Sequence, residues 1–178
     1  MSQVSFENKT VIVTGAGNGL GKAYALDLGS RGAKVVVNDL GGAVDGSGSG
    51  STPADEVVNE IIANGGEAVA NYDSVATKEG GASIVQTAID NFGTVDAVVN
   101  NAGILRDKSF ANMSEEELSL IIDVHLKGTF FVSQPAFKVM KENAYGRIVN
   151  VASPSGLFGN FGQSNYGAAK MGIVGLTN

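Results

Sequence analysis

Short runs of apolar residues, many of them β-branched, recur along the chain, and each is followed by a segment whose apolar residues have helical spacing. Runs of this length are typical of strands buried on both faces. Helical segments between them indicate parallel pairing, because parallel strands need a crossover connection. The alternation predicts one α/β domain with a doubly wound parallel sheet. The expected strands lie at residues 9–14, 33–38, 67–71, 95–99 and 147–152.

The segments between these strands contain signals for helix ends and loops. Pro53 suits a first helical turn, and the Asn-Gly-Gly sequence at 64–66 ends the same helix. Residues 114–117 form a capping-box pattern that begins a long helix, in which Pro135 is expected to cause a kink. Residues 41–51 are rich in glycine and serine, and we expect them to form a long, flexible surface loop within the domain.

A glycine-rich loop follows the first expected strand and opens a helix. Residues 14–21 are Thr-Gly-Ala-Gly-Asn-Gly-Leu-Gly, and Lys22 begins a good helix-forming segment. Glycines let the backbone approach a pyrophosphate, and the helix N-terminus offers it free N–H groups and the positive end of the helix dipole. A tight turn without a ligand is the alternative. We expect contacts to a dinucleotide cofactor from Gly15, Asn18, Gly19, Leu20 and Gly21.

Acidic residues close the second and third expected strands. An acidic side chain at Asp39 can hydrogen-bond an adenosine ribose and repel a 2′-phosphate. Neither the glycine loop nor the residues directly after Asp39 supply a cation for that phosphate, so NAD is favoured over NADP; a solvated carboxylate is the alternative. Asp73, followed by Ser74 and Val75, is expected to reach the adenine amino group.

The fourth expected strand ends in polar amides. Asn101, Ala102 and Gly103 fit either close contact with a cofactor ribose or a lock between neighbouring strand ends. Because the carboxyl ends of parallel strands meet at one edge, we expect the glycine loop, Asp39, Asn101 and Ser153 to lie in one crevice.

Tyr166 and Lys170 share one face if the segment from Ser164 on is helical. A free phenol is a poor base at neutral pH, but a nearby ammonium group stabilises the phenolate. Such a tyrosine can exchange a proton with a substrate alcohol. Ser153 follows the fifth expected strand and can hydrogen-bond the same substrate oxygen. A surface pair without a catalytic role is the alternative.

Composition narrows the possible partners. The net charge of −6 argues against a nucleic-acid partner. The sequence has no cysteine and one histidine, His125, so neither a thiol nucleophile nor a histidine-based metal cluster is expected. No apolar leader and no membrane-spanning segment is apparent. We expect a soluble cytoplasmic protein, or a peroxisomal one in a eukaryote, with a small-molecule substrate.

The glycine loop, the Asn-Asn-Ala-Gly sequence at 100–103 and the spacing of Ser153, Tyr166 and Lys170 resemble the short-chain dehydrogenase/reductase family over nearly the whole chain. The resemblance implies a Rossmann-like fold and hydride transfer between NAD and a secondary alcohol or ketone. Tyr166 would be the general base, Lys170 would bind the nicotinamide ribose and stabilise the phenolate, and Ser153 would hold the reacting oxygen. A homodimer or homotetramer is also implied.

Shorter stretches are similar to the (3R)-hydroxyacyl-CoA dehydrogenases of this family, both peroxisomal and bacterial. This similarity implies NAD-dependent oxidation of a (3R)-3-hydroxyacyl-CoA to the 3-ketoacyl-CoA. Two alternatives stay open: a dehydrogenase for another secondary alcohol, such as a steroid or a sugar, and an NAD-binding fragment without catalysis. The stretches are residues 38–42, 70–75, 101–107, 123–126 and 159–163.

Two features depart from the general family pattern. Most members carry an asparagine at the position of His125, and that asparagine supports a water in a proton relay. The hydroxyacyl-CoA dehydrogenases of the family share the histidine. His125 is therefore expected either to be a packed residue or to support that relay. The chain also stops at Asn178 within the Tyr-Lys helix, which would leave 148–151 as an apolar edge strand. We expect residues 1–178 to be one truncated domain that lacks the last strands and the substrate loop.

Overall fold

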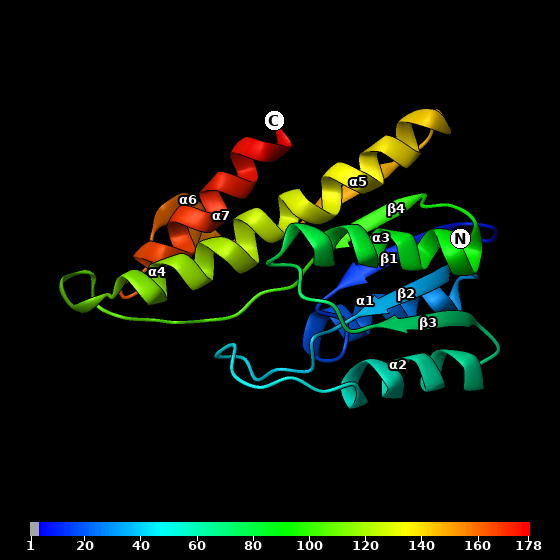
Figure 1. The fold of residues 1–178 in the computed structure, drawn as a ribbon, viewed down its shortest axis with the longest axis horizontal. Coiled ribbons are helices and arrows are strands. Elements are labelled where there is room, and N and C mark those ends of the chain that lie inside the picture. Colours follow the sequence, from blue (N-terminus) through cyan, green and yellow to red (C-terminus); the bar gives the residue numbers. More distant parts are fainter. Residues whose placement is uncertain (1–3) are drawn as a thin grey trace.

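A computed structural model describes residues 4–178 and contains a five-stranded parallel sheet in the order β3-β2-β1-β4-β5 (Figure 1). The chain winds outward from β1 in both directions, which confirms the predicted doubly wound, Rossmann-like sheet. Each strand lies within its predicted run, except that β4 ends one residue later. The strands are β1 (Thr10–Thr14), β2 (Lys34–Asn38), β3 (Glu67–Asn71), β4 (Ala97–Asn100) and β5 (Arg147–Asn150).

The helices connect the strands and surround the sheet (Figure 1). A short 3₁₀ turn, η1 (Phe110–Asn112), precedes the fourth α-helix, and a π-helical segment, η2 (Ile122–Lys127), follows it. The α-helices are α1 (Gly19–Ser30), α2 (Thr52–Ala63), α3 (Lys78–Phe92), α4 (Glu115–Ile121), α5 (Gly128–Glu142), α6 (Pro154–Phe158) and α7 (Ser164–Thr177).

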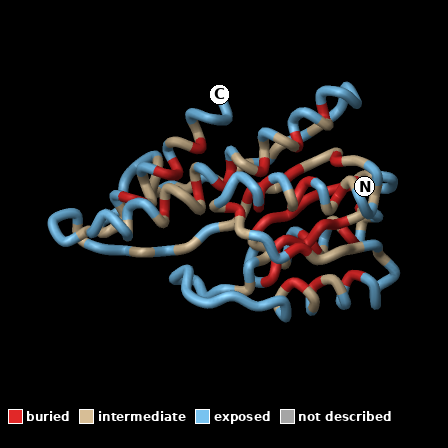
Figure 2. The backbone as a smooth tube through the Cα atoms, viewed as in Figure 1, coloured by how far each residue is buried: buried red, intermediate tan, exposed pale blue. Residues whose placement is uncertain are grey.

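The sheet has an apolar core on each face, because successive side chains of a strand point to opposite sides. Val11 and Val13 of β1 pack with α1 and α2 on one face. Ile12, between them, packs with α3 and α5 on the other face. Figure 2 shows the buried positions along the central strands and on the helix sides that face them. The sheet is therefore covered on both faces, as the β-branched runs predict.

The long helical stretch after β4 begins at the predicted capping box. Ser114 Oγ accepts a hydrogen bond from Glu117 N, and Glu117 Oε2 accepts one from Ser114 N. Pro135 does not interrupt α5, which continues to Glu142, and the helix loses its regular α form earlier, in η2. Pro135 has no N–H to offer the Phe131 carbonyl, and α3 approaches that carbonyl so closely that a Cβ on Gly81 would lie 2.5 Å from its oxygen.

The glycine- and serine-rich segment at 41–51 forms an exposed surface loop, as predicted, but with defined hydrogen bonds rather than the free chain that its composition suggests. Ala43 N donates to Ser47 O at 2.8 Å, and Gly50 N donates to Leu40 O at 2.9 Å. Val44 O accepts from Leu105 N at 3.0 Å, across more than sixty positions of sequence. The loop is thereby attached to the segment that follows β4.

Strand β5 lies at the edge of the sheet, and Val149 is 54% exposed. This is the edge position that the sequence predicts. Within the described residues 4–178, no helix combines the length and the apolar character needed to cross a membrane.

Candidate active site

A single amide side chain joins the carboxyl ends of the neighbouring strands β1 and β4. Asn101 Nδ2 donates to Thr14 O and to Gly15 O, each at 3.0 Å. In return, Thr14 Oγ1 accepts from the backbone N–H groups of Asn101 and Ala102, each at 3.1 Å. Of the two roles that the sequence allows for Asn101, the structure shows the lock between strand ends.

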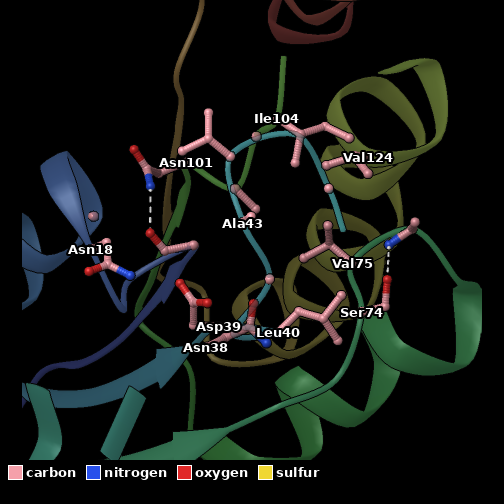
Figure 3. A pocket seen from close by; sticks show the side chains of 18 of the residues that line it. Asn18, Asn38, Asp39, Leu40, Ala43, Ser74, Val75, Asn101, Ile104 and Val124 are labelled. Atoms are coloured by element: carbon pink, nitrogen blue, oxygen red, sulfur yellow. Dashed lines mark hydrogen bonds between the residues drawn. The ribbon is translucent and has the colours of Figure 1, made fainter. Parts of the chain in front are cut away.

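A cavity of about 460 Å³ opens at this edge of the sheet (Figure 3). It is lined by every residue that the sequence suggests for cofactor contact outside the Tyr-Lys helix. The residues come together because they follow the carboxyl ends of the neighbouring strands β1, β2, β3 and β4. They are Gly15, Asn18, Gly19, Leu20, Gly21, Asp39, Asp73, Ser74, Val75, Asn101, Ala102 and Gly103.

Part of the cavity wall comes from segments that the sequence does not assign to a site. Ala43 lies on the loop at 41–51, and Ile104 and Val124 come from the segment after β4 and from η2 (Figure 3). Some of the wall residues are direct neighbours of predicted ones, such as Leu40 after Asp39 and Ile104 after Gly103, whereas Ala43 and Val124 come from separate segments. The wall residues missed by sequence reasoning are Asn38, Leu40, Gly42, Ala43, Val44, Gly46, Ala76, Ile104, Leu120 and Val124.

The start of α1 can hold an anion. Its N-cap, Asn18, makes no side-chain cap, and the first turn contains no acidic residue, so the free N–H groups keep their capacity to bind one. A Cβ on Gly21 would collide with Gly15 O and would lie 2.6 Å from Asn101 Nδ2. The loop therefore needs glycine at this position, and the resulting cradle and cavity fit a dinucleotide pyrophosphate.

Asp39 holds the glycine loop against the end of β2. Its Oδ2 accepts from Gly17 N at 2.7 Å, and its Oδ1 accepts from Gly41 N at 2.7 Å. The side chain is therefore anchored rather than freely solvated. A carboxylate has about four lone-pair positions, so each oxygen keeps capacity to accept from a ribose hydroxyl.

A network of buried amides orders the end of β3. Asn38 Nδ2 donates to Asn71 Oδ1 and to Asp73 O, each at 2.9 Å. Asp73 Oδ2 accepts from Asn71 Nδ2 at 2.9 Å and from Ser83 Oγ at 2.7 Å. Asn38 and Asn71 lie at the predicted strand ends, but their role in fixing Asp73 depends on the pairing of β2 with β3.

Tyr166 and Lys170 lie on α7, and Lys170 Nζ is 5.5 Å from the centroid of the Tyr166 ring. Lys170 is only 3% exposed, and its Nζ donates to Val151 O at 2.6 Å. Burial lowers the pKa of Lys170 to about 8.

Ser153 caps α6, its Oγ accepting from Ser155 N at 3.2 Å. None of Ser153, Tyr166 and Lys170 lines the cavity at the strand ends, so the predicted common crevice does not include Ser153.

His125 packs against the predicted catalytic tyrosine. Its ring meets the Tyr166 ring edge-on, with centroids 5.1 Å apart and an interplanar angle of 85°. His125 Nε2 lies 2.8 Å from Ile104 O, while the buried Nδ1 has no hydrogen-bond partner among the described residues. Burial first, and then the charge of Lys170, lower the pKa of His125 to about 4, against a smaller opposing effect of Ile104. The imidazole is therefore neutral at pH 7.

Asn165, directly before Tyr166, fixes the start of α7 and was not recognised in the sequence. It is 1% exposed, and both polar atoms of its side chain form hydrogen bonds. Asn165 Nδ2 donates to Arg106 O at 3.0 Å and to Glu117 O at 3.1 Å, and its Oδ1 accepts from Tyr166 N at 2.8 Å. This amide holds Tyr166 against the segment that leaves the cavity.

No cluster of three or more potential metal-ligating side chains occurs in the part of the chain that the structure describes. The titratable groups beside the predicted catalytic tyrosine are Lys170 and His125. A phenol beside a buried amine, close to a nucleotide-sized cavity, is suited to proton exchange with an alcohol.

The sheet and its strand-end cavity are those of a Rossmann-like, nucleotide-binding domain, and comparison with known proteins gives the family. Residues 9–178 match the short chain dehydrogenase family, to which this chain belongs. The members of this family are oxidoreductases that use a nicotinamide cofactor.

Individual relatives are more specific. The chain is 60% identical over 173 residues to the peroxisomal hydratase-dehydrogenase-epimerase of Saccharomyces cerevisiae, covering 97% of this chain and 19% of that protein. It is 44% identical over 169 residues to the 3-oxoacyl-[acyl-carrier-protein] reductase of Synechocystis, covering 95% of this chain and 65% of the reductase. The chain thus spans only part of each relative.

A solved structure shows the same arrangement with a cofactor. The 7α-hydroxysteroid dehydrogenase in complex with NADH and 7-oxo glycochenodeoxycholic acid superimposes with a TM-score of 0.88 at 29% identity. The match covers 97% of this chain and 64% of that enzyme.

We predict that His125 stays neutral in the folded protein until the pH approaches 4. His125 is the sole histidine of the sequence, so its imidazole signals in a nuclear magnetic resonance titration are unambiguous. The folded protein should titrate near pH 4, and the urea-unfolded protein near the usual value of about 6.5. Because the unfolded state alone binds this proton between those values, His125 should reduce stability as the pH falls through that window. A folded-state midpoint near 6.5 would contradict the buried, neutral ring.

Proposed function

We propose that the chain oxidises a (3R)-3-hydroxyacyl-CoA to the 3-ketoacyl-CoA with NAD. The observation that carries the proposal is the buried Lys170 beside the Tyr166 ring, next to a cavity with a glycine cradle and a free helix N-terminus. The name of the yeast relative includes a dehydrogenase, and that of the cyanobacterial relative specifies a 3-oxoacyl group. Both support chemistry at carbon 3 of an acyl chain.

In the proposed reaction the alcohol loses a hydride from carbon 3 and a proton from its hydroxyl group. The oxidised nicotinamide, when bound, supplies the hydride acceptor. Tyr166 acts as a phenolate, which the positive charge of Lys170 stabilises, and it becomes a neutral phenol when it takes the hydroxyl proton. Ser153 donates a hydrogen bond to the substrate oxygen. The C–O bond becomes a carbonyl, so one hydride and one proton account for the two-electron oxidation.

The residues around the strand-end cavity have proposed roles toward NAD. The N-terminus of α1, with Gly19 and Gly21, binds the pyrophosphate. Asp39 accepts from the adenosine ribose, and its charge disfavours a 2′-phosphate. Lys170 contacts the nicotinamide ribose. We also propose association into a homodimer or homotetramer, and a peroxisomal location in a eukaryote or a cytoplasmic one in a bacterium; the peroxisomal yeast relative supports the former location.

A hydroxysteroid is the second candidate substrate. The 0.88 TM-score to a 7α-hydroxysteroid dehydrogenase supports a steroid alcohol as the alternative. The acyl substrate is favoured because the more similar relatives, at 60% and 44% identity, include one that is named for a 3-oxoacyl group.

We predict that the chain reduces NAD when given a (3R)-3-hydroxyacyl-CoA and not when given the (3S) epimer. Tyr166→Phe should lower kcat by about 100-fold or more, because it removes the proton acceptor. Nicotinamide absorbance measures the rate, and a 7α-hydroxysteroid is assayed in parallel. If the chain turned over only the steroid, a hydroxysteroid and not a 3-hydroxyacyl-CoA would be its substrate. NAD binding without turnover of any secondary alcohol would identify a non-catalytic cofactor-binding unit.

We predict a strong preference of the chain for NAD over NADP. In Asp39→Ala the ratio of kcat/KM for the two cofactors should shift toward NADP by about 10- to 100-fold, because a charge-assisted hydrogen bond contributes about 1.5–3 kcal/mol and repulsion of the 2′-phosphate also ends. Asp39→Asn is the matched control for shape, since it removes the charge and keeps one accepting oxygen. Equal rates with both cofactors in the unmodified chain would remove this role from Asp39.

A further inference from the structure

We propose that Arg106 and Lys108 bind the phosphate groups of the coenzyme A part of the substrate. The inference deepens the proposed function and depends on it for the identity of the substrate. It assigns the two side chains to a second phosphate site, separate from the glycine cradle at the start of α1.

Arg106 and Lys108 lie on the segment that connects the cofactor cavity with the predicted catalytic helix. Ile104, two residues before Arg106, lines the cavity. Arg106 O accepts from Asn165 Nδ2 at 3.0 Å, and Lys108 N donates to Gly162 O at 2.8 Å. Figure 1 shows this segment, between β4 and α4, running toward the end of the molecule where α6 and the start of α7 lie. The two cations are thus held beside the approach to Tyr166.

Neither cation is neutralised by a close carboxylate. The ion pairs of residues 4–178 occupy Lys9, Lys22, Arg31, Lys34 and Lys127. Arg106 and Lys108 form no ion pair within 4 Å in this described part. Arg106 Nε is in addition buried without a hydrogen-bond partner. A buried donor of this kind favours an acceptor, and an anionic one satisfies both its hydrogen-bonding capacity and the charge.

Glu117 and Asp45, two carboxylates on which these cations act, already have hydrogen-bond partners of their own. Hydrogen bonds from Ser114 lower the pKa of Glu117, and the charges of Lys108 and Arg106 add to that effect. The positive charges of Arg106 and Lys108 therefore both stabilise the ionised Glu117 in the first turn of α4. Asp45, on the loop at 41–51, accepts from Ser47 N at 2.9 Å and from Ser47 Oγ at 2.6 Å. These carboxylates offset part of the positive charge without forming ion pairs with Arg106 or Lys108 in the described part of the chain. Both side chains can therefore bind phosphate oxygens.

Aromatic side chains are exposed on the cation-bearing segment and on the stretch that leads into the turn at Gly162. Phe110, Phe158 and Phe161 are 81%, 86% and 91% exposed. Phe161 precedes Gly162, whose carbonyl accepts from Lys108 N. The side chain of Gln163 joins this turn to the cation-bearing segment, donating from Nε2 to Asp107 Oδ2 at 2.9 Å. Exposed rings next to a pair of cations match a ligand with an apolar arm, an aromatic base and phosphates, which is the chemistry of coenzyme A.

The alternative ligand for these cations, the cofactor pyrophosphate, has a better site. The N-terminus of α1 offers it free N–H groups, and the cradle lies at the edge of the sheet with Gly15 and Asn101. A thioester substrate needs its phosphates at the far end of the pantetheine arm, away from the reacting carbon. Arginine suits this task, because its planar guanidinium matches phosphate oxygens.

The test compares two thioesters of the same 3-hydroxyacyl group, one on coenzyme A and one on N-acetylcysteamine, which has no phosphate. For Arg106→Gln and for Lys108→Gln, kcat/KM for the coenzyme A thioester should fall about five- to tenfold each, through KM, and the loss should shrink at high salt. The values of kcat/KM for the N-acetylcysteamine thioester and for NAD should each stay within about twofold of those of the unmodified chain. The matched control is Lys138→Gln, on an exposed α5 lysine that forms no ion pair within residues 4–178. This variant should leave kcat/KM for both thioesters unchanged.

Equal losses with both thioesters, or no loss with either, would overturn the inference. Calorimetric titration with free coenzyme A separates this outcome from a failure of the proposed function. The unmodified chain should bind free coenzyme A, and the double variant Arg106→Gln with Lys108→Gln should bind it at least tenfold more weakly. Binding without turnover of the thioesters would contradict the proposed reaction alone. Affinity that is equal in the chain and the double variant, or absent from both, would contradict the phosphate site.

Discussion

The bond between the ends of β1 and β4 is the constraint on which the site depends. Asn101 donates to two carbonyl groups of the strand and loop opposite, and Thr14 Oγ1 accepts from two N–H groups in return. The strands already pair through Ile12 and Val98, but that pairing alone leaves their last residues free to separate. These hydrogen bonds fix the point at which the glycine loop and the segment after β4 leave the sheet. Both segments line the cavity, together with the ends of β2 and β3.

The segment after β4 carries this fixed geometry to the tyrosine. Ile104 touches His125 Nε2, Arg106 O accepts from Asn165, and both His125 and Asn165 contact Tyr166. Lys170 is fixed separately, by Val151 beyond β5. The predicted proton-transfer residues are therefore placed by two strands, β4 and β5. The groups that fix these residues are backbone carbonyls and buried amides, which resist displacement because an unpaired buried group costs free energy.

The sequence predicts those features that depend on local pattern. The apolar runs locate all five strands, β3 at its predicted residues 67–71, and the Ser114 capping box locates the start of α4. Glycine and acidic residues at strand ends also suffice to name much of the cavity lining. What the sequence does not reveal depends on contacts between distant residues: the anchoring of the loop at 41–51, the network of Asn38 with Asn71, and the role of Asn165. A polar side chain in isolation has no periodicity, so its partners emerge only once the sheet is assembled. The close approach of Gly81 to the Phe131 carbonyl, which Pro135 leaves without its helical partner, is a related case, because it depends on the packing of α3 against α5.

The most direct test of this account is a calorimetric titration of the chain and of Asn101→Asp with NADH. The aspartate keeps the shape of the side chain but replaces its donor with an acceptor that faces two carbonyl oxygens. We expect one NADH per unmodified chain and binding at least tenfold weaker in the variant, since an unpaired buried group costs about 1–3 kcal/mol and charge adds to that cost. Equal affinity in both proteins would show that the cofactor cavity does not depend on the lock between β1 and β4. Absence of binding in the unmodified chain would contradict the assignment of the cavity to a nicotinamide cofactor.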